Sequence, residues 1–320
     1  MKSTHFHQQT IREISIDELD VIGQGGVGTI YRINDDQILK LYTPDITLDE
    51  VREKKRTSRE ALLHGVPTMI SFEIVRASDR YGIIFELLPS DTVGAAVMTH
   101  PDRIEEYGRK MGMLLKTLHM IRMPLHTLPR FCEQVSAWID IMERDYHARS
   151  RSVRAMREFL DSFPDADRPL HCDFHEGNVM LQNGELILID IDDICTGNPI
   201  FDLAFCYGNH DMLARSKNLL KQSTGLDPQT ARRMRHLAMA EYFGADYEEK
   251  RRQMDSLFFL TALFTFAVSP ARVGESPYMT TFFLKLILYI IHPVFTLLWN
   301  TRRRHYEKLI KDLLPEDLGL

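Results

Sequence analysis

A short segment in the second half of the chain carries a histidine, an aspartate and an asparagine at fixed spacing. His171, Asp173 and Asn178 form the pattern H-x-D-x-x-x-x-N, and a further aspartate follows at Asp190. Amide and carboxylate oxygens are the hard ligands that Mg²⁺ prefers alongside substrate phosphates. With Asn178 and Asp190 assigned to a metal ion, Asp173 remains to orient a hydroxyl and accept its proton. The spacing therefore indicates phosphoryl transfer to an alcohol.

A predicted β-hairpin brings these residues together. The turn Asn183-Gly184 lies between two apolar runs, which is the strongest short hairpin signal. Pairing through that turn sets Asn178 opposite Ile189, on strands about 4.8 Å apart. Asn178 and Asp190 are then expected at the open end of the hairpin, next to Asp173.

The same segment has a second interpretation, as a transition-metal site. In an extended segment His171, Asp173 and His175 share one face. Cys172 then points away, and no distant pair of cysteines or histidines completes a site. We therefore prefer the magnesium interpretation.

A glycine-rich stretch near the N-terminus has the pattern G-x-G-x-x-G. Its glycines are Gly23, Gly25, Gly26 and Gly28, and the predicted strand Ile30–Ile33 follows them. A dinucleotide-binding fold would place a helix there, and a Walker loop would need Gly-Lys-Ser/Thr. A strand–loop–strand flap instead lets backbone N–H groups approach nucleotide phosphates. A glycine-rich hairpin without a ligand is the alternative.

Lys40 lies on the next predicted strand, between Leu39 and Leu41. A lysine in this setting is usually solvent-facing, but after a glycine loop it can bridge the α- and β-phosphates if a carboxylate holds it. The helix that follows offers Glu53 and Glu60, seven residues apart and on the same face. We favour Glu53, with Glu60 as the reserve.

The apolar pattern divides the chain into two regions. Alternation predicts a small β-sheet with one helix, which begins at the capping box Thr47–Glu50 and ends near His64. After the linker Pro89-Ser90-Asp91, apolar residues recur at helical spacing, interrupted by the hairpin. We expect an α+β fold with a nucleotide-binding lobe at 1–88 and a larger helical lobe for catalysis and substrate at 89–320.

Composition and charge indicate which partners and which cellular compartment to expect. The 320 residues include 39 Lys and Arg against 45 Asp and Glu, a formal charge of −6, so the global cationic field of a nucleic-acid binder is missing. The four cysteines stand singly, which suits a reducing compartment. The polar N-terminus predicts no signal peptide. We therefore expect a cytoplasmic enzyme. The sequence does not indicate an oligomeric state.

Residues 279–299 are mostly apolar and have the length of a bilayer span. Lys285 and His292-Pro293 interrupt them, and a lysine at the centre of a span costs about 2.5–3.5 kcal/mol. We therefore favour buried C-terminal helices over membrane contact. Arg302-Arg303-Arg304, just beyond, fits a membrane anchor but is more often a solvated helix face.

The segment His171–Asn178, with Asp190 and the following Gly197–Ala204, resembles the aminoglycoside phosphotransferase and choline kinase-like family. That resemblance implies a bilobal protein-kinase-like fold and ATP as the phosphate donor. It also implies the following roles: Asp173 as catalytic base, Asn178 and Asp190 as Mg²⁺ ligands, Lys40 and Glu53 as the phosphate-binding pair, Asp202 as a brace of the catalytic loop, and His171 and His175 in support. The adenine is expected at the hinge, near Glu86 and Leu88.

Two departures from kinase patterns bear on the acceptor. Cys172 stands where this family often has glycine and protein kinases have arginine. Asp190 is followed by Ile191-Asp192 instead of Phe-Gly, and no A-P-E-like segment follows. We predict an ATP- and Mg²⁺-dependent phosphotransferase acting on a hydroxyl of an aminoglycoside, sugar or amino alcohol. A protein kinase and a nucleotide-binding pseudokinase are the alternatives.

Overall fold

The chain divides into two units, seen in a computed structural model that describes residues 11–25, 27–208, 210, 217–273 and 281–319. The first unit holds residues 1–63 and 68–89, and the second holds 64–67 and 90–320. The division falls after Pro89, one residue beyond the expected position. His64–Pro67 belongs to the second unit, where the Pro67 carbonyl accepts a hydrogen bond from Leu188 N–H (2.8 Å).

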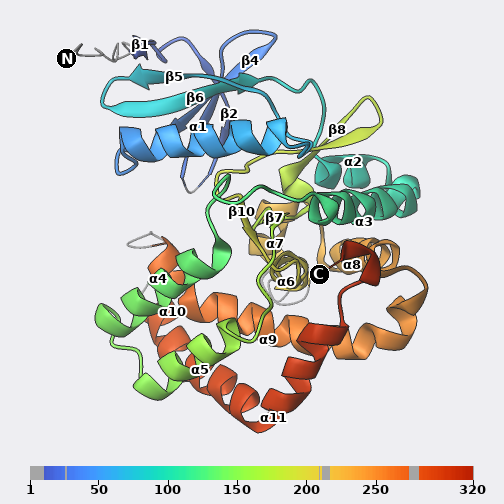
Figure 1. The fold of residues 1–320 in the computed structure, drawn as a ribbon. Helices are drawn as coiled ribbons and strands as arrows, with labels where there is room; N and C mark the ends of the chain where they lie inside the picture. Colours follow the sequence, from blue (N-terminus) through green and yellow to red (C-terminus); the bar gives the residue numbers. More distant parts are fainter. Residues whose placement is uncertain (1–10, 26, 209, 211–216, 274–280, 320) are drawn as a thin grey trace, which may run out of the picture. The chain divides into compact units, whose positions relative to one another are not determined.

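The first unit is a mixed sheet with one helix. Its strands lie in the order β1-β5-β6-β4-β3-β2, and only the β1–β5 pairing is parallel. The elements are β1 (Arg12–Glu13), β2 (Asp20–Gln24), β3 (Gly28–Arg32), β4 (Gln37–Tyr42), α1 (Leu48–Leu63), β5 (Ser71–Ala77) and β6 (Arg80–Glu86), and Figure 1 labels all of them except β3. The small sheet with one helix is confirmed.

The capping box predicted at the start of α1 is present. Thr47 N–H donates to Glu50 Oε2 (2.7 Å), and Glu50 N–H donates to Thr47 Oγ1 (3.4 Å). These bonds satisfy two of the N–H groups that the first turn leaves without partners. The helix ends at Leu63, just before Gly65 with its positive φ of 92°.

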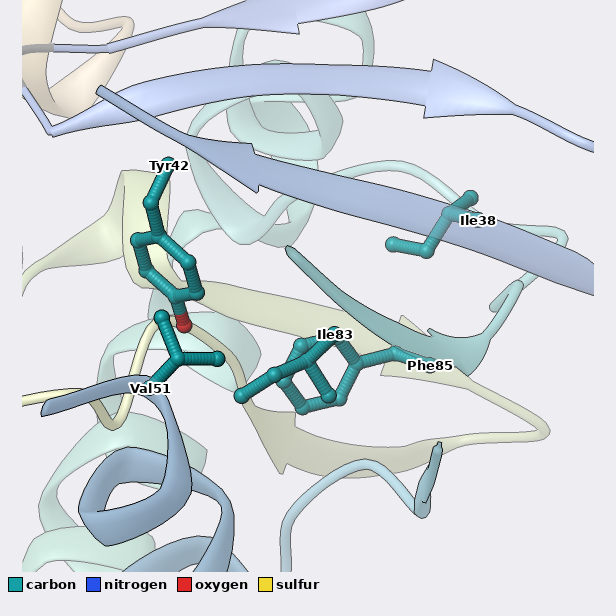
Figure 2. Packing of buried hydrophobic residues seen from close by; sticks show 5 residues of the cluster. All are labelled: Ile38, Tyr42, Val51, Ile83 and Phe85. Atoms are coloured by element: carbon teal, nitrogen blue, oxygen red, sulfur yellow. The ribbon is translucent and has the colours of Figure 1, made fainter. Parts of the chain in front are cut away.

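One face of β4 packs against α1. Ile38 and Tyr42 from β4 meet Ile83 and Phe85 from β6 and Val51 from α1 in a single apolar cluster (Figure 2). Side chains alternate along a strand, so Lys40 shares the face of Ile38 and Tyr42. The sequence therefore places a lysine among apolar side chains on the face of the sheet that packs on the helix.

The second unit is mainly helical, as the spacing predicted (Figure 1). Its helices are α2 (Val93–Thr99), α3 (Ile104–Met120), α4 (Phe131–Arg144), α5 (Ser150–Leu160), α6 (Ile200–Tyr207), α7 (Lys217–Thr224), α8 (Pro228–Phe243), α9 (Tyr247–Val273), α10 (Thr281–Leu286) and α11 (His292–Asp312). Short strands pair as β7 (Arg168–Leu170) with β10 (Cys195–Gly197), and β8 (Val179–Gln182) with β9 (Glu185–Leu188).

Two described segments are long and apolar enough to cross a membrane, Pro228–Ala271 and Phe283–Asp312. The most apolar stretch of the first is 61% buried, whereas that of the second is only 28% buried. The second segment is therefore buried along one face, which includes Phe295 and Trp299, and carries exposed apolar side chains on the other. Residues 279 and 280 lie outside the described residues.

Candidate active site

Asp202 holds the loop that carries the predicted base. It lies on α6 with 0% exposure, and its two carboxylate oxygens accept from the N–H groups of His171 and Cys172, each at 2.8 Å. Charge-assisted hydrogen bonds of this kind are stronger than neutral ones. The geometry matches the bracing role expected for Asp202, and it fixes the backbone directly before Asp173.

Two residues that the sequence did not reveal complete this brace. His119 on α3 approaches Asp202 Oδ2 through Nε2 (3.2 Å), and its Nδ1 lies 2.8 Å from the Tyr242 hydroxyl on α8. A carboxylate only accepts, so Nε2 carries the hydrogen. Both residues fall at ordinary helical positions in the sequence, and only the tertiary structure shows their role.

His171 ties the loop to the hairpin. Its Nε2 lies 3.0 Å from the Ile189 carbonyl oxygen, and Asp173 N–H donates to its Nδ1 (3.3 Å). Ile189 N–H in turn donates to the Asn178 carbonyl (3.0 Å), which confirms the predicted register. The turn at Asn183-Gly184 has positive φ at both residues, 52° and 86°, as a type I′ turn requires.

Asp173 presents a half-exposed carboxylate on this rigid support. Its side chain is 46% exposed, whereas the His175 side chain beside it is 7% exposed. The Asn178 amide donates to both the backbone oxygen and Oδ2 of Asp173, each at 3.1 Å. The carboxylate is therefore oriented by its own loop while it stays open to a reactant.

His175 adds a charge-dependent contact to Asp173. Its Nε2 lies 3.6 Å from Asp173 Oδ2, and Gly177 N–H donates to its Nδ1 (3.1 Å). Burial alone lowers the pKa of His175, but Asp173, with Glu176 and Asp190 nearby, outweighs burial and raises that pKa above its ordinary value. A protonated His175 would offset part of the negative charge gathered here.

A buried ion pair lies beneath the loop. Glu176 Oε2 is 2.8 Å from His210 Nε2, and both side chains are 3% exposed or less. Burial raises the pKa of Glu176, but the contact with His210 outweighs it, so the pKa of this carboxyl lies below its usual range. Gly177 next to it has no room for a side chain, since a Cβ would lie 2.0 Å from the Ser223 carbonyl oxygen. Glu176 and His210 were not among the predicted site residues.

Asn178 and Asp190 form a donor set that fits a magnesium ion. The Asn178 amide nitrogen is used on Asp173, which leaves the amide oxygen as the ligand atom. Asp190 follows Ile189, the residue paired with Asn178, and has a left-handed φ of 56° that ends the strand. Its charge also acts on His175. Two hard oxygen donors next to a carboxylate base are the chemistry that a magnesium-bound phosphate needs.

The glycines of the loop between β2 and β3 differ in how much space a side chain would have at each position. A Cβ on Gly28 would lie 2.5 Å from the Leu41 carbonyl oxygen, whereas one on Gly25 would meet nothing within 4 Å and one on Gly23 only ordinary contacts with Ile30. Gly25 N–H donates to the Gly28 carbonyl (2.9 Å). Gly26 lies outside the described residues. Packing thus explains Gly28 but not Gly25.

Lys40 is 8% exposed, and its ammonium lies 5.5 Å from the centre of the Tyr42 ring. The partner that we expected for it, Glu53, turns to solvent: its side chain is 52% exposed and binds Arg56 at 2.6 Å. Arg56 lowers the pKa of Glu53. Glu60, the reserve, is half-buried. Spacing placed both glutamates on one face of α1, and the structure adds that Glu60 is less exposed than Glu53.

The residues expected to hold the adenine lie at the end of the first unit. Glu86 Oε1 accepts from Ile70 N–H (2.7 Å), and Leu88 is buried at 5% exposure. Leu87 N–H donates to the Asp36 carbonyl (2.8 Å). The backbone of this segment is thus anchored on both sides.

A cavity opens beside the catalytic loop in the second unit. It is small, with about 60 Å³ open to the centre of a water molecule, and Cys172 lies in its wall next to Asp173. Among its described lining residues Asp193 is the one acidic side chain. The aromatic part of the wall comes from α4, α6 and α9 and consists of Phe131, Trp138, Phe205 and Phe264.

Solved structures of small-molecule kinases share this fold. The streptomycin–ATP complex of the aminoglycoside phosphotransferase APH(2″)-IIa is 15% identical over 87% of this chain and 93% of that one, with a TM-score of 0.56. A choline/ethanolamine kinase family protein of Mesorhizobium loti is 14% identical over 92% of both chains, with a TM-score of 0.53. Choline kinase of Cryptosporidium parvum is 11% identical over 92% of this chain and 93% of that one, with a TM-score of 0.55. A search of curated proteins finds no match.

The two units and the braced aspartate loop are those of a protein-kinase-like fold, which these solved structures share. A model of the phosphotransferase enzyme family matches residues 19–238, well over half of the sequence. The chain belongs to this phosphotransferase enzyme family, as the resemblance of its motifs indicated.

Proposed function

We propose that this phosphotransferase uses ATP and Mg²⁺ to phosphorylate a hydroxyl group of a small amino alcohol. One observation carries the catalytic part: Asp173 is a half-exposed carboxylate whose loop is held by Asp202 and whose oxygen is held by the Asn178 amide. A general base needs this combination of access and fixed orientation.

The transfer assigns each described group one task. Asp173 orients the acceptor hydroxyl and takes its proton as the oxygen–phosphorus bond forms and the bond between the β- and γ-phosphates breaks, releasing ADP. Asn178 and Asp190 would hold the metal, which neutralises phosphate charge. His171 and His175 keep the loop and the base in place.

The first unit contains the residues that we assign to nucleotide binding. No packing contact requires glycine at position 25, which supports a role in which the absence of a side chain lets nucleotide phosphates approach the backbone of this loop. Lys40 is the cation that we assign to the α- and β-phosphates. We now assign Glu60 as its partner in place of Glu53, since Glu53 is exposed and bound to Arg56. Glu86 and Leu88 stay our choice for the adenine.

The cavity beside Cys172 supports the choice of an amino alcohol as acceptor. Aromatic faces attract organic cations, and Trp is the strongest of them. With one acidic side chain, Asp193, in the described wall, the cavity suits a compact molecule with a single positive charge. A polycationic aminoglycoside would need several carboxylates to replace its hydration, and a neutral sugar would need more polar groups.

We place the activity in the cytoplasm and expect no nucleic-acid partner. The four cysteines are free thiols, in keeping with a reducing compartment, and the formal charge of −6 argues against a nucleic-acid surface.

The deciding experiment measures ADP release and ATP binding with Asp173→Asn. We expect turnover to fall at least a thousandfold while calorimetric ATP affinity changes less than threefold, because the base acts on the acceptor and not on the nucleotide. Asp161→Asn, at an exposed position after α5, is the matched control. Turnover by Asp173→Asn near the wild-type rate would refute the assignment.

The metal is tested separately with Asp190→Ala. Mg²⁺ should strengthen ATP binding by the wild type, and this dependence should disappear in the variant.

The acceptor is tested by comparing amino alcohols, neutral sugars and aminoglycosides at equal concentration. Trp138→Leu should raise the KM for an amino alcohol about tenfold and leave the KM for ATP unchanged. A neutral sugar as the best acceptor would contradict the amino-alcohol proposal alone.

A further inference from the structure

The segment Phe283–Asp312 presents two unlike faces. One face is fixed to the protein: Phe295 and Trp299 are 0% exposed, and both rings lie against Phe159 of α5 at centroid distances of 5.4 and 5.2 Å. His292 Nε2 lies 2.9 Å from the Ala267 carbonyl of α9. These contacts make α11 an integral part of the second unit.

The other face leaves large apolar side chains in solvent. Tyr289, Ile290, Val294 and Leu297 are 63%, 52%, 38% and 61% exposed. Single exposed apolar residues are common on protein surfaces, but four within nine residues of one helical segment form a patch. This patch also explains why only 28% of the most apolar stretch is buried.

Basic residues flank the patch. Lys285 precedes it, and Arg302, Arg303, Arg304, Lys308 and Lys311 follow it, whereas Glu307 and Asp312 are the acidic residues of the segment. Arg303 binds both Glu158 and Glu307 at 2.8 Å. Arg304, Lys308 and Lys311 lie beyond a kink of the helix at Arg302 and are exposed, and their spacing of four and three residues puts them on one face of the part that follows the kink. The segment is strongly cationic in a chain whose formal charge is −6.

We infer that this surface, Tyr289–Leu297 with Arg304, Lys308 and Lys311, docks the enzyme onto an anionic lipid bilayer. An apolar patch with adjacent basic residues is the pattern of a helix that lies in the plane of the interface. Tyr289, Ile290, Val294 and Leu297 enter the acyl boundary, and the basic side chains contact lipid phosphates. A full span is ruled out by the buried face, since crossing would break its contacts with α5 and α9. A second copy of the chain is disfavoured, because two such basic faces repel each other.

Vesicle co-sedimentation of the full chain tests the inference. The wild type should bind phosphatidylglycerol vesicles at least tenfold more tightly than phosphatidylcholine vesicles, and added salt should weaken the binding. Leu297→Asp should lose at least tenfold in affinity. The triple change Arg304→Gln, Lys308→Gln, Lys311→Gln should remove most of the preference for anionic lipid. Leu125→Asp, which alters a 70% exposed leucine elsewhere, should bind like the wild type.

Each alternative gives a different result. Equal binding to both lipids, or full binding by Leu297→Asp, would overturn the inference. So would a wild-type dimer that Leu297→Asp separates without any vesicle binding, which would identify a second copy as the occupant. Ile290→Ser serves as a second variant, and thermal unfolding verifies that both variants fold. Asp173→Asn should keep full vesicle binding, so this variant tests membrane docking separately from the proposed phosphoryl transfer.

Discussion

The two units hold their proposed site residues by different means. In the second unit the Asp173 loop is fixed by the buried hydrogen bonds that its backbone donates to Asp202 and by contacts within its own segment. In the first unit Lys40 lies on a strand and the glutamates proposed as its partner lie on a separate helix, whose ion pairs, such as Glu53–Arg56, face solvent. Buried bonds define one geometry, whereas exposed pairs exchange with water at little cost.

This contrast has an energetic side. Removing one partner of a buried charged network leaves the other groups without solvent or a partner, and the protein loses several kcal/mol. Removing one partner of an exposed pair returns the other to water. The catalytic loop should therefore be sensitive to single changes, and the surface of α1 should tolerate them.

The largest expected effect is that of Asp202→Ala. The change leaves two backbone N–H groups and His119 without their buried acceptor, and we expect a loss of about 3–5 kcal/mol of unfolding free energy. Glu53→Ala, at a side chain that is 52% exposed, should change it by less than about 0.5 kcal/mol. Urea unfolding of both variants gives the comparison. Equal losses would show that the two units do not differ in this way.

Next in size are alanine substitutions in the glycine loop. Gly28→Ala sets a Cβ against a backbone oxygen of β4, and we expect about 1–3 kcal/mol of destabilisation. Gly25→Ala has open space and should leave stability within about 0.5 kcal/mol. If Gly25 serves the nucleotide, its variant should raise the KM for ATP several-fold. An unchanged KM would instead favour a loop without a ligand.

Paired substitutions on α1 test which glutamate is the partner of Lys40. Glu60→Gln should lower kcat/KM about tenfold, equivalent to about 1.4 kcal/mol of transition-state stabilisation. Glu53→Gln, whose carboxylate binds Arg56, should stay within about twofold. Steady-state kinetics with varied ATP measure both. The reverse order would restore Glu53 to the role that the sequence first suggested.

The same contrast explains what the sequence could predict. The hairpin, its register and the position of Asn178 beside Ile189 follow from the local signal Asn183-Gly184, because a two-residue turn fixes its strands. The capping box at Thr47 was equally local. The choice between Glu60 and Glu53 as the proposed partner of Lys40 depends on how α1 is rotated on the sheet, and residue spacing alone does not show this rotation.

Long-range contacts were out of reach for the same reason. His119, Tyr242 and His210 come from positions about 30 to 70 residues away from the loop that they support, and each falls in a helical or irregular stretch without a motif. The exposed face of the C-terminal segment could not be located from the sequence, because composition gives total apolarity but not which side of the helix the rest of the protein covers.

His175 in the second unit and Glu50 in the first should contribute to the pH dependence of stability with opposite signs. His175 has a raised pKa, so its contribution is complete below its ordinary value near 6.5 and is lost as the pH rises through the folded-state value. Glu50 has a pKa lowered by its bonds to Thr47, so its contribution is present above about 4.5 and is lost as the pH falls. Unfolding free energies of the wild type, His175→Gln and Glu50→Gln between pH 3 and 9 test both signs, and a rise in the His175 contribution above pH 6.5 would contradict the first.

The smallest expected effect concerns the backbone of Cys172, which has a left-handed φ of 64° between the brace and the base. A side chain costs about 1–2 kcal/mol in that conformation, whereas glycine adopts it freely. Cys172→Gly and Cys172→Ala both remove the sulfur that lies 3.2 Å from Cys195 Sγ, so their difference isolates the backbone. We expect the glycine variant to be more stable than the alanine variant by about 1 kcal/mol. At Cys195, which lies in β10, the order should reverse, because glycine in a strand is less stable than alanine by about 0.5–1 kcal/mol. If the alanine variant were the more stable one at both positions, the bonds to Asp202, and not the side chain, would set the energy of this turn.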